Sequence, residues 1–262
     1  MSSAAQKPAS LTPDSPFVDL VAPSPNIGER RGGGRIDFLV LHYTGLESAR
    51  RSLEVLCDPR CEVSCHYLID EDGTVTQMVR EADRAWHAGL SAWHGIRDVN
   101  SHSVGIEIQN PGHTNGYPDF PDVQMRALED LAGDIISRHA IRPEHVLAHS
   151  DIAPQRKIDP GEKFDWARLH RSGIGHWVAP RPTGQPAALS QFRSGQASLA
   201  VASCQERLAA YGYDVALDGI LDERTRKVIA AFQRHFRPAL VDGLPDTSTI
   251  DTLDELLAAL GG

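Results

Sequence analysis

Short apolar runs alternate with one long amphipathic segment between residues 35 and 178, and this alternation restricts the fold more than any other feature of the chain. A nearly continuous apolar run from Ile36 to Leu41 is typical of a strand buried on both faces. Asp72-Gly73 lies between two further runs and is a strong hairpin signal. Strands are therefore expected at residues 36–41, 66–70, 74–79, 104–108 and 146–148.

One helix is expected between Pro121 and His139. Pro121 suits a first helical turn. Apolar residues then recur at near-helical spacing, at Val123, Leu128, Leu131, Ile135 and Ile136. Strands interleaved with helices predict an α/β (α+β) domain over residues 35–178, with a mixed central sheet flanked by helices.

The two ends of the chain have a different character. Residues 1–34 are rich in Pro, Ser and Gly and are interpreted as an N-terminal arm without its own core. Residues 179–195 contain three prolines and few bulky apolar side chains, which indicates a linker.

Residues 196–262 carry an internal repeat. Asp218-Gly219 and Asp242-Gly243 each open the pattern D-G-x-x-D-x-x-T. In each copy the second aspartate, Asp222 or Asp246, can cap a following amphipathic helix. An earlier helix, ended by Gly212, completes an expected small three-helix domain without a visible catalytic group.

Composition excludes several classes of partner. With 26 Lys+Arg against 35 Asp+Glu, the net charge of -9 repels phosphate backbones, so no nucleic-acid partner is expected. No apolar window is long enough for a membrane span, and the start lacks the features of a signal peptide. The cysteines, Cys57, Cys61, Cys65 and Cys204, favour free thiols over a disulfide framework, although a Cys57/Cys61 pair stays open.

Histidines stand at the ends of two expected strands, where a sheet can build a site on one rim. His42 ends the first strand and His149 follows the last one. The loop after His149 adds an ammonium group, Lys157, and a carboxylate, Asp159. His42, His149 and Asp159 have the chemistry of catalytic zinc ligands, but two structural histidines are about as compatible with the spacing alone.

Five successive segments resemble the motifs of AmpD/AmiD-type N-acetylmuramoyl-L-alanine amidases (amidase family 2) in order and spacing. They are Leu41-His42-Tyr43-Thr44, Ser64 to Gly73, Trp86-His87-Ala88-Gly89, Ser103 to Asn110, and His149-Ser150-Asp151 through Gly161. The C-terminal repeat resembles the three-helix peptidoglycan-binding domain found beside cell-wall hydrolases.

The resemblance implies a zinc (Zn2+) enzyme that cleaves the amide between the lactyl group of N-acetylmuramic acid and L-alanine in peptidoglycan or anhydro-muropeptides. It implies His42, His149 and Asp159 as metal ligands. It also implies Glu107 as general base and Lys157 as the group that stabilises the oxyanion. Substrate contacts are expected from Trp86, His87, Asn110 and Tyr43, whereas His66 is interpreted as structural.

Two alternatives stay open at this stage. A peptidoglycan recognition protein of similar fold would bind without catalysis, and a cysteine-nucleophile amidase would use one of the clustered thiols. The chain is expected to be a monomer in the cytoplasm, with the periplasm as the alternative compartment. Deletion of residues 196–262 is expected to weaken binding to insoluble peptidoglycan and to spare turnover of a small muropeptide.

Overall fold

The computed structural model describes residues 11–182 and 196–261. Contacts group the chain into two units, which we call unit 1 (residues 1–89 and 100–141) and unit 2 (residues 90–99 and 142–262). Residues 183–195, the greater part of the expected linker, and residues 1–10 of the expected arm lie outside the described residues.

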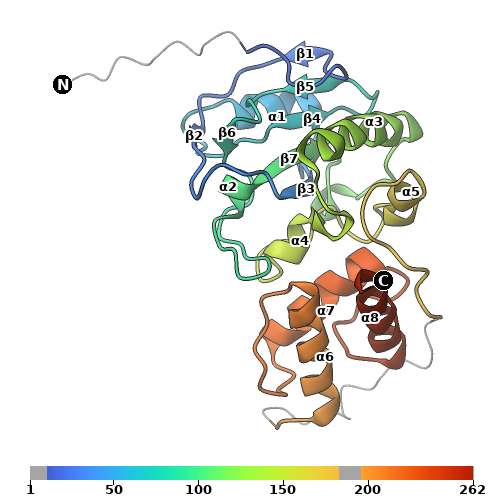
Figure 1. The fold of residues 1–262 in the computed structure, drawn as a ribbon. Helices are drawn as coiled ribbons and strands as arrows, with labels where there is room; N and C mark the ends of the chain where they lie inside the picture. The colour runs from blue at the N-terminus through green and yellow to red at the C-terminus, as the bar shows by residue number, and fades with distance from the viewer. Residues whose placement is uncertain (1–10, 183–195, 262) are drawn as a thin grey trace. The chain divides into compact units, whose positions relative to one another are not determined.

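Within the described ranges, a six-stranded mixed sheet forms the frame of the fold (Figure 1). Unit 1 supplies five of its strands in the order β1-β5-β4-β7-β3, and β8 belongs to unit 2. The strands of unit 1 are β1 (Leu20–Val21), β3 (Phe38–Tyr43), β4 (Tyr67–Ile69), β5 (Val75–Gln77) and β7 (Ser103–Ile108). β3 and β4 flank β7 in parallel, and β4 and β5 form the expected antiparallel hairpin. The mixed sheet predicted from the sequence is confirmed.

The N-terminal segment contributes strands that the sequence did not reveal. β1 pairs with β5, and β2 (Ile27–Glu29) pairs with β6 (Asp83–Ala85) in a separate two-stranded sheet. These strands are two and three residues long, too short for an alternating pattern to stand out. The Arg30 guanidinium then anchors the segment by donating to the carbonyl oxygens of Glu81, Ser101 and Ser103.

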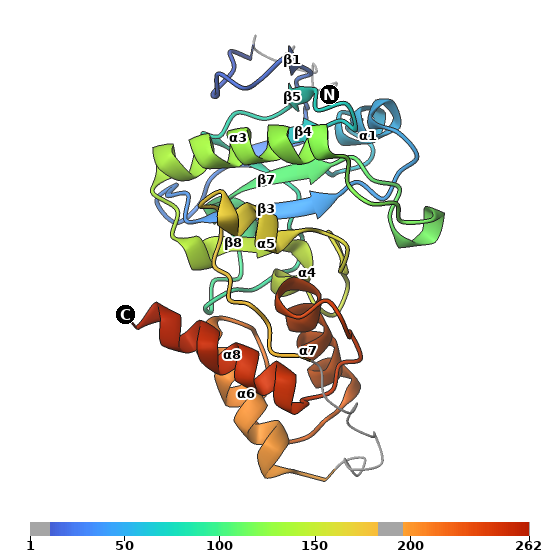
Figure 2. The same ribbon diagram turned by 90° about the vertical axis from the view of Figure 1, so that its right-hand side faces the viewer.

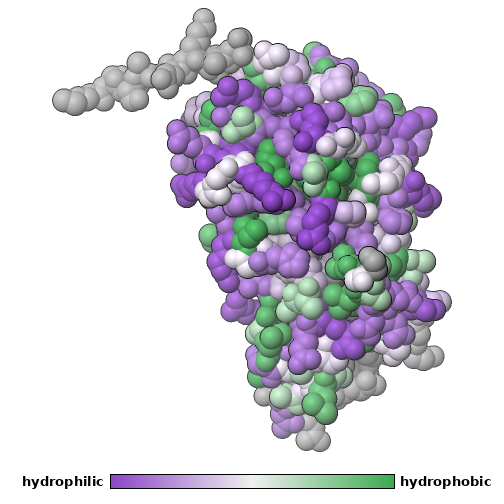
Figure 3. Space-filling view, in the orientation of Figure 1, coloured by the Kyte–Doolittle hydropathy of each residue, from purple (hydrophilic) through white to green (hydrophobic). Residues whose placement is uncertain are grey.

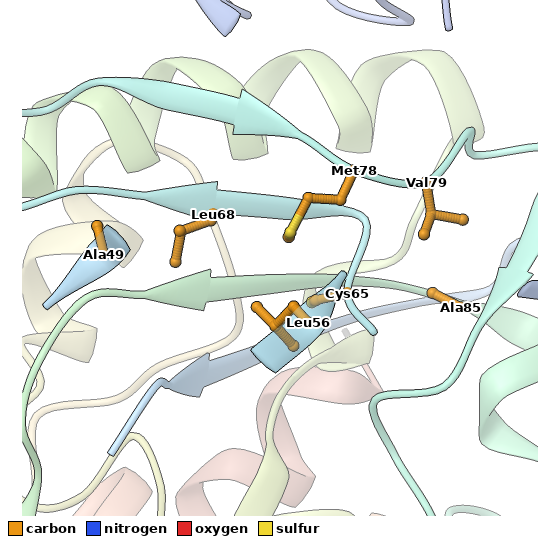
Figure 4. Packing of buried hydrophobic residues seen from close by; sticks show 7 residues of the cluster. All are labelled: Ala49, Leu56, Cys65, Leu68, Met78, Val79 and Ala85. Atoms are coloured by element: carbon orange, nitrogen blue, oxygen red, sulfur yellow. The ribbon is translucent and has the colours of Figure 1, made fainter. Parts of the chain in front are cut away.

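Helices cover the sheet of unit 1. Figure 2 shows α3 (Asp122–His139) lying along one face, as the apolar periodicity predicts, and Leu128 and Leu131 are fully buried. α1 (Ala49–Leu56) packs through Ala49 and Leu56 against Leu68 of β4 in the core cluster drawn in Figure 4. α2 (Val99–His102) and a 3-10 turn (His113–Asn115) complete these connections.

From residue 142 on, unit 2 contains short elements, one of which starts with the expected site residue His149. A 3-10 turn (Pro143–His145) leads into β8 (Val146–Ala148), and α4 (His149–Ile152) starts directly after it. α5 (Trp166–Arg171) follows and is capped by Asp165, whose side chain accepts from the Arg168 N–H. β8 has the bounds expected from the sequence.

The C-terminal helices of unit 2 confirm the repeat. They are α6 (Leu199–Tyr211), α7 (Glu223–Phe236) and α8 (Thr247–Leu260). Asp222 accepts from the Thr225 N–H at 2.7 Å and Asp246 from the Thr249 N–H at 2.8 Å, so both aspartates cap helices as expected.

Each copy of the repeat also contains a buried glutamine that the pattern did not include. Gln205 accepts from the N–H of Gly219 at 2.7 Å, and Gln233 accepts from the N–H of Gly243 at 2.8 Å. Their amide groups donate to the repeat aspartate and threonine of the same copy. These hydrogen bonds connect each turn to the helix before it.

The face drawn in Figure 3 is mainly hydrophilic, with hydrophobic residues in small separate groups. Across residues 11–182 and 196–261, no helix combines the length and apolar character that crossing a membrane requires.

Candidate active site

His42 and Glu107 are neighbours on adjacent parallel strands. The register pairs His42 of β3 with Glu107 of β7, and Glu107 in turn with Leu68 of β4. Residues paired in this way point to the same face of a sheet, which is the face that α1 covers at Leu68. Glu107 is half-buried, whereas Ile106 and Ile108 are fully buried. The alternation expected for Glu107 is therefore present, and its side chain shares a face with His42.

The imidazole ring of His87 contacts two other imidazole rings of unit 1, those of His42 and His66. Nε2 of His42 lies 3.0 Å from Nδ1 of His87, whose Nε2 lies 3.1 Å from the Ser103 hydroxyl. The His66 ring contacts the His87 ring edge to face, with centroids 5.6 Å apart. Asn100 holds the backbone of this loop by accepting from the His87 N–H. The sequence suggested His87 as a substrate contact, and its bond to His42 is a role that the sequence did not indicate.

His66 is a structural residue, as expected. Nδ1 of His66 accepts from the Gly105 N–H at 3.0 Å, and Nε2 lies 3.2 Å from the carbonyl oxygen of Asp83 and 3.1 Å from the Arg30 guanidinium. Burial, and then the nearby Arg30 guanidinium, lowers the pKa of His66 from 6.5 to about 3. The ring is therefore neutral and fixed in one tautomer.

His149 and Asp159 are brought together by the loop that follows β8. Nδ1 of His149 lies 3.0 Å from Oδ2 of Asp159, and the Ser150 N–H donates to the Asp159 carbonyl oxygen. Both side chains are almost fully buried. Lys157 is half-buried in the same loop, with its N–H donating to the Ala153 carbonyl oxygen.

A group of potential metal ligands emerges from these residues. His42, His149 and Asp159 are all buried, and each offers one ligand atom within 4.8 Å of the others. Two imidazoles and one carboxylate form a donor set that a divalent transition metal accepts. The sequence named these same three residues.

Comparison with known proteins identifies the family. Residues 32–162 match the model of the N-acetylmuramoyl-L-alanine amidase family, and residues 198–253 match that of a putative peptidoglycan binding domain. The chain is 41% identical to the N-acetylmuramoyl-L-alanine amidase AmiD of Escherichia coli over 87% of its own length and 84% of that protein. The chain belongs to the N-acetylmuramoyl-L-alanine amidase family.

Solved structures of relatives agree with this amidase in fold. AmiD of E. coli, solved with the substrate anhydro-N-acetylmuramic acid-L-Ala-D-γ-Glu-L-Lys, matches with a TM-score of 0.73 over 87% of this chain and 90% of that one. AmpDh3 of Pseudomonas aeruginosa, solved with anhydromuramic pentapeptide, is 33% identical and matches with a TM-score of 0.73 over 89% and 95% of the two chains.

Three of the four cysteines of the amidase, Cys57, Cys65 and Cys204, do not suit the role of a thiolate nucleophile. All four lie within the described residues and are free thiols. Burial, and then the Glu107 carboxylate, raises the pKa of Cys65 well above its usual value, and burial raises the pKa of Cys204 to about 12. Burial also raises the pKa of Cys57. A reactive cysteine needs the opposite shift, and Cys65 packs in the apolar core instead.

The other residues expected to contact substrate, Trp86, Tyr43 and Asn110, each have contacts outside the group of potential metal ligands. Trp86 is half-buried and borders a hollow of about 400 Å³ that Arg30 and Arg84 also line. The Tyr43 hydroxyl lies 3.0 Å from Nδ1 of His113. Asn110 is buried, and its amide donates to the Pro118 carbonyl oxygen inside its own loop.

Proposed function

We propose that this amidase is a zinc enzyme that hydrolyses the amide between the lactyl group of N-acetylmuramic acid and L-alanine of the stem peptide. The observation that carries the proposal is the buried donor set of His42, His149 and Asp159. Anhydro-muropeptides are the proposed substrates, because the relatives AmiD and AmpDh3 were each solved in complex with such a compound. Intact peptidoglycan is the proposed second substrate.

The donor set fits zinc. Zinc takes imidazole nitrogen and carboxylate oxygen at about 2.0–2.2 Å, so the ligand atoms of a tetrahedral site lie roughly 3–4 Å apart. The ligand atoms of His42, His149 and Asp159 lie within 4.8 Å of one another, so small side-chain rotations suffice to reach that spacing. Three protein ligands also leave a coordination position for water or substrate. When bound, zinc supplies a Lewis acid that polarises the scissile carbonyl and strengthens water as a nucleophile near neutral pH.

Glu107 is the proposed general base. Its carboxylate shares a sheet face with His42, and its partial exposure on an otherwise buried strand leaves it accessible to a water molecule. A carboxylate in this position can take a proton from the attacking water and pass it to the leaving amine. Lys157, half-buried in the loop that ends at Asp159, is the proposed donor to the developing oxyanion.

The proposed substrate contacts keep distinct roles. His87 contacts His42, so it suits recognition near the scissile amide. Tyr43, the next residue of β3, points to the opposite face of the sheet and contacts His113, so a substrate contact there is proposed away from His42. Trp86 offers an indole that can lie against a sugar ring. Asn110 is buried and its amide is bonded at both ends within its own loop, so its proposed part in substrate binding is to order that loop. The C-terminal helices are proposed to bind peptidoglycan, in keeping with the family match over residues 198–253.

The amidase is proposed to be a monomer. Its proposed compartment is the cytoplasm, where its free cysteines would stay reduced. Fractionation of cells that express the full-length protein tests the compartment, and recovery with the periplasmic fraction would contradict it.

The first experiment measures release of L-alanyl peptide from a purified anhydro-muropeptide. We expect a chelator to abolish turnover, zinc to restore it, and Glu107→Gln to lower kcat by about 10²- to 10⁴-fold. Glu54→Gln is the matched control, because Glu54 is an exposed carboxylate on α1 that pairs with the surface arginines Arg50 and Arg51. Chelator-resistant turnover, or full activity of Glu107→Gln, would contradict the proposal.

A further inference from the structure

A buried hydrogen-bond network joins the C-terminal helices to α4, the helix that begins at His149. Asp151 of α4 is 1% exposed. Its Oδ1 accepts from the Tyr213 hydroxyl at 2.7 Å, and its Oδ2 lies 2.7 Å from Nδ1 of His235. Oδ2 also accepts from the Ala148 N–H at 2.8 Å. All of these residues belong to unit 2.

The donors of this network are themselves rigidly held. Burial, and then the Asp151 carboxyl, raises the pKa of Tyr213 well above its usual value, so the hydroxyl keeps its proton and donates. The His235 ring stacks on Trp166, with centroids 3.7 Å apart. The Trp93 ring contacts the Tyr213 ring edge to face, with ring centroids 4.8 Å apart.

α4 cannot hold its own position. It is four residues long, and a single helical turn has almost no intrinsic stability in water. Asp151 stands two residues after His149, and the Ser150 N–H between them donates to the carbonyl oxygen of Asp159. Whatever fixes Asp151 therefore fixes the backbone that carries one proposed ligand and touches another.

We propose that Tyr213, in the loop after α6, and His235 of α7 are positioning residues for the metal site, acting through Asp151 on His149 and Asp159. The C-terminal helices are then part of the catalytic apparatus and more than a peptidoglycan anchor. This inference rests on the proposed metal site, and it opposes the expectation from the sequence that deletion of residues 196–262 spares turnover of a small muropeptide.

Two tyrosine variants of the full-length protein test the inference. Tyr213→Phe removes the hydroxyl that donates to Asp151. Tyr211→Phe is the matched control: Tyr211 is equally buried in the same helical region, and its hydroxyl forms a 2.8 Å hydrogen bond with His176, which is remote in sequence from the proposed ligands. Both variants delete one buried hydroxyl, so both should lower the melting temperature by similar amounts.

Zinc affinity, measured by competition with a chromogenic chelator, separates positioning from stability. We expect Tyr213→Phe to weaken zinc binding by about tenfold, the lower end of the effect of outer partners of metal ligands. Tyr211→Phe should change it by less than about twofold. Equal affinity changes in the two variants, or none in Tyr213→Phe, would refute the inference while the wild type still binds zinc.

Rescue at His235 gives an independent reading. His235→Asn keeps an N–H donor near the position of Nδ1, whereas His235→Leu removes it. We expect the leucine variant to bind zinc about tenfold more weakly and the asparagine variant to recover most of that loss. Equal affinities of the two variants would contradict positioning through Asp151. A wild type that binds no zinc would overturn the proposed metal site and this inference with it.

Discussion

Gly105 of β7 is a position in unit 1 where one added methyl group should be strongly destabilising. A Cβ atom added there would lie 2.7 Å from Cγ and from Nδ1 of His87. Ordinary contacts begin at 3.4 Å, so the ring must retreat by about 0.7 Å (3.4 minus 2.7). His87 is 6% exposed and is held between His42 and Ser103, so the ring cannot move without lengthening these two hydrogen bonds.

The cost of Gly105→Ala follows from these contacts. Overpacking a buried site costs about 1–3 kcal/mol. Loss of one hydrogen bond between buried groups adds about 1 kcal/mol, so we expect Gly105→Ala to destabilise the protein by about 2–4 kcal/mol. For a protein of this size that loss corresponds to a fall in Tm of roughly 5–15 °C. Turnover should fall at least about tenfold, because displacement of His87 disturbs His42.

Gly133→Ala is the matched control, since Gly133 lies in the interior of α3 and a Cβ there meets nothing within 4 Å. Alanine is the better helix former, so this variant should gain about 0.5–1 kcal/mol. We therefore expect thermal unfolding, followed by circular dichroism, to show a lower Tm for Gly105→Ala and a higher Tm for Gly133→Ala. A Gly105→Ala protein as stable and as active as the wild type would refute the packing argument.

Three further predictions concern pH, metal and the repeat. The pKa of His66 is about 3 in the folded protein and lower than in the unfolded chain, so only the unfolded state gains a proton between about pH 6.5 and pH 3. The stability contributed by this group is therefore complete above pH 6.5 and should fall by about 1.4 kcal/mol per pH unit below it. In urea unfolding from pH 7 to pH 4, the free energy of unfolding should depend less steeply on pH in His66→Gln than in the wild type. Saturating zinc at 100 times its Kd should raise the free energy of unfolding by about 2.7 kcal/mol, and no thermal shift on addition of zinc would argue against the proposed site. Gln233→Leu leaves the Gly243 N–H and the Leu244 carbonyl without their glutamine partner, so it should lower the free energy of unfolding in urea by about 2–4 kcal/mol. The same change at the exposed Gln155 should lower it by less than about 0.5 kcal/mol. Similar losses in the two variants would contradict the role of Gln233.

Local sequence patterns were sufficient for most of the fold. The position of α3 follows from its apolar periodicity, and β8 follows from a short apolar run directly before His149. Asp222 and Asp246 cap their helices because the cap is a bond between residues three apart. The short strands β1 and β2 escaped this reasoning, because two or three residues cannot establish a period.

The sequence by itself determined the residue types of the site and the order in which the chain presents them, including His42, His149 and Asp159. Only the tertiary structure decided which groups support them. His87 reaches His42 from a separate loop, and His235 reaches Asp151 from a helix far along the chain. No local pattern marks such partners, because hydrogen bonds between buried groups distant in sequence exist only once the packing of whole elements has brought the two side chains together.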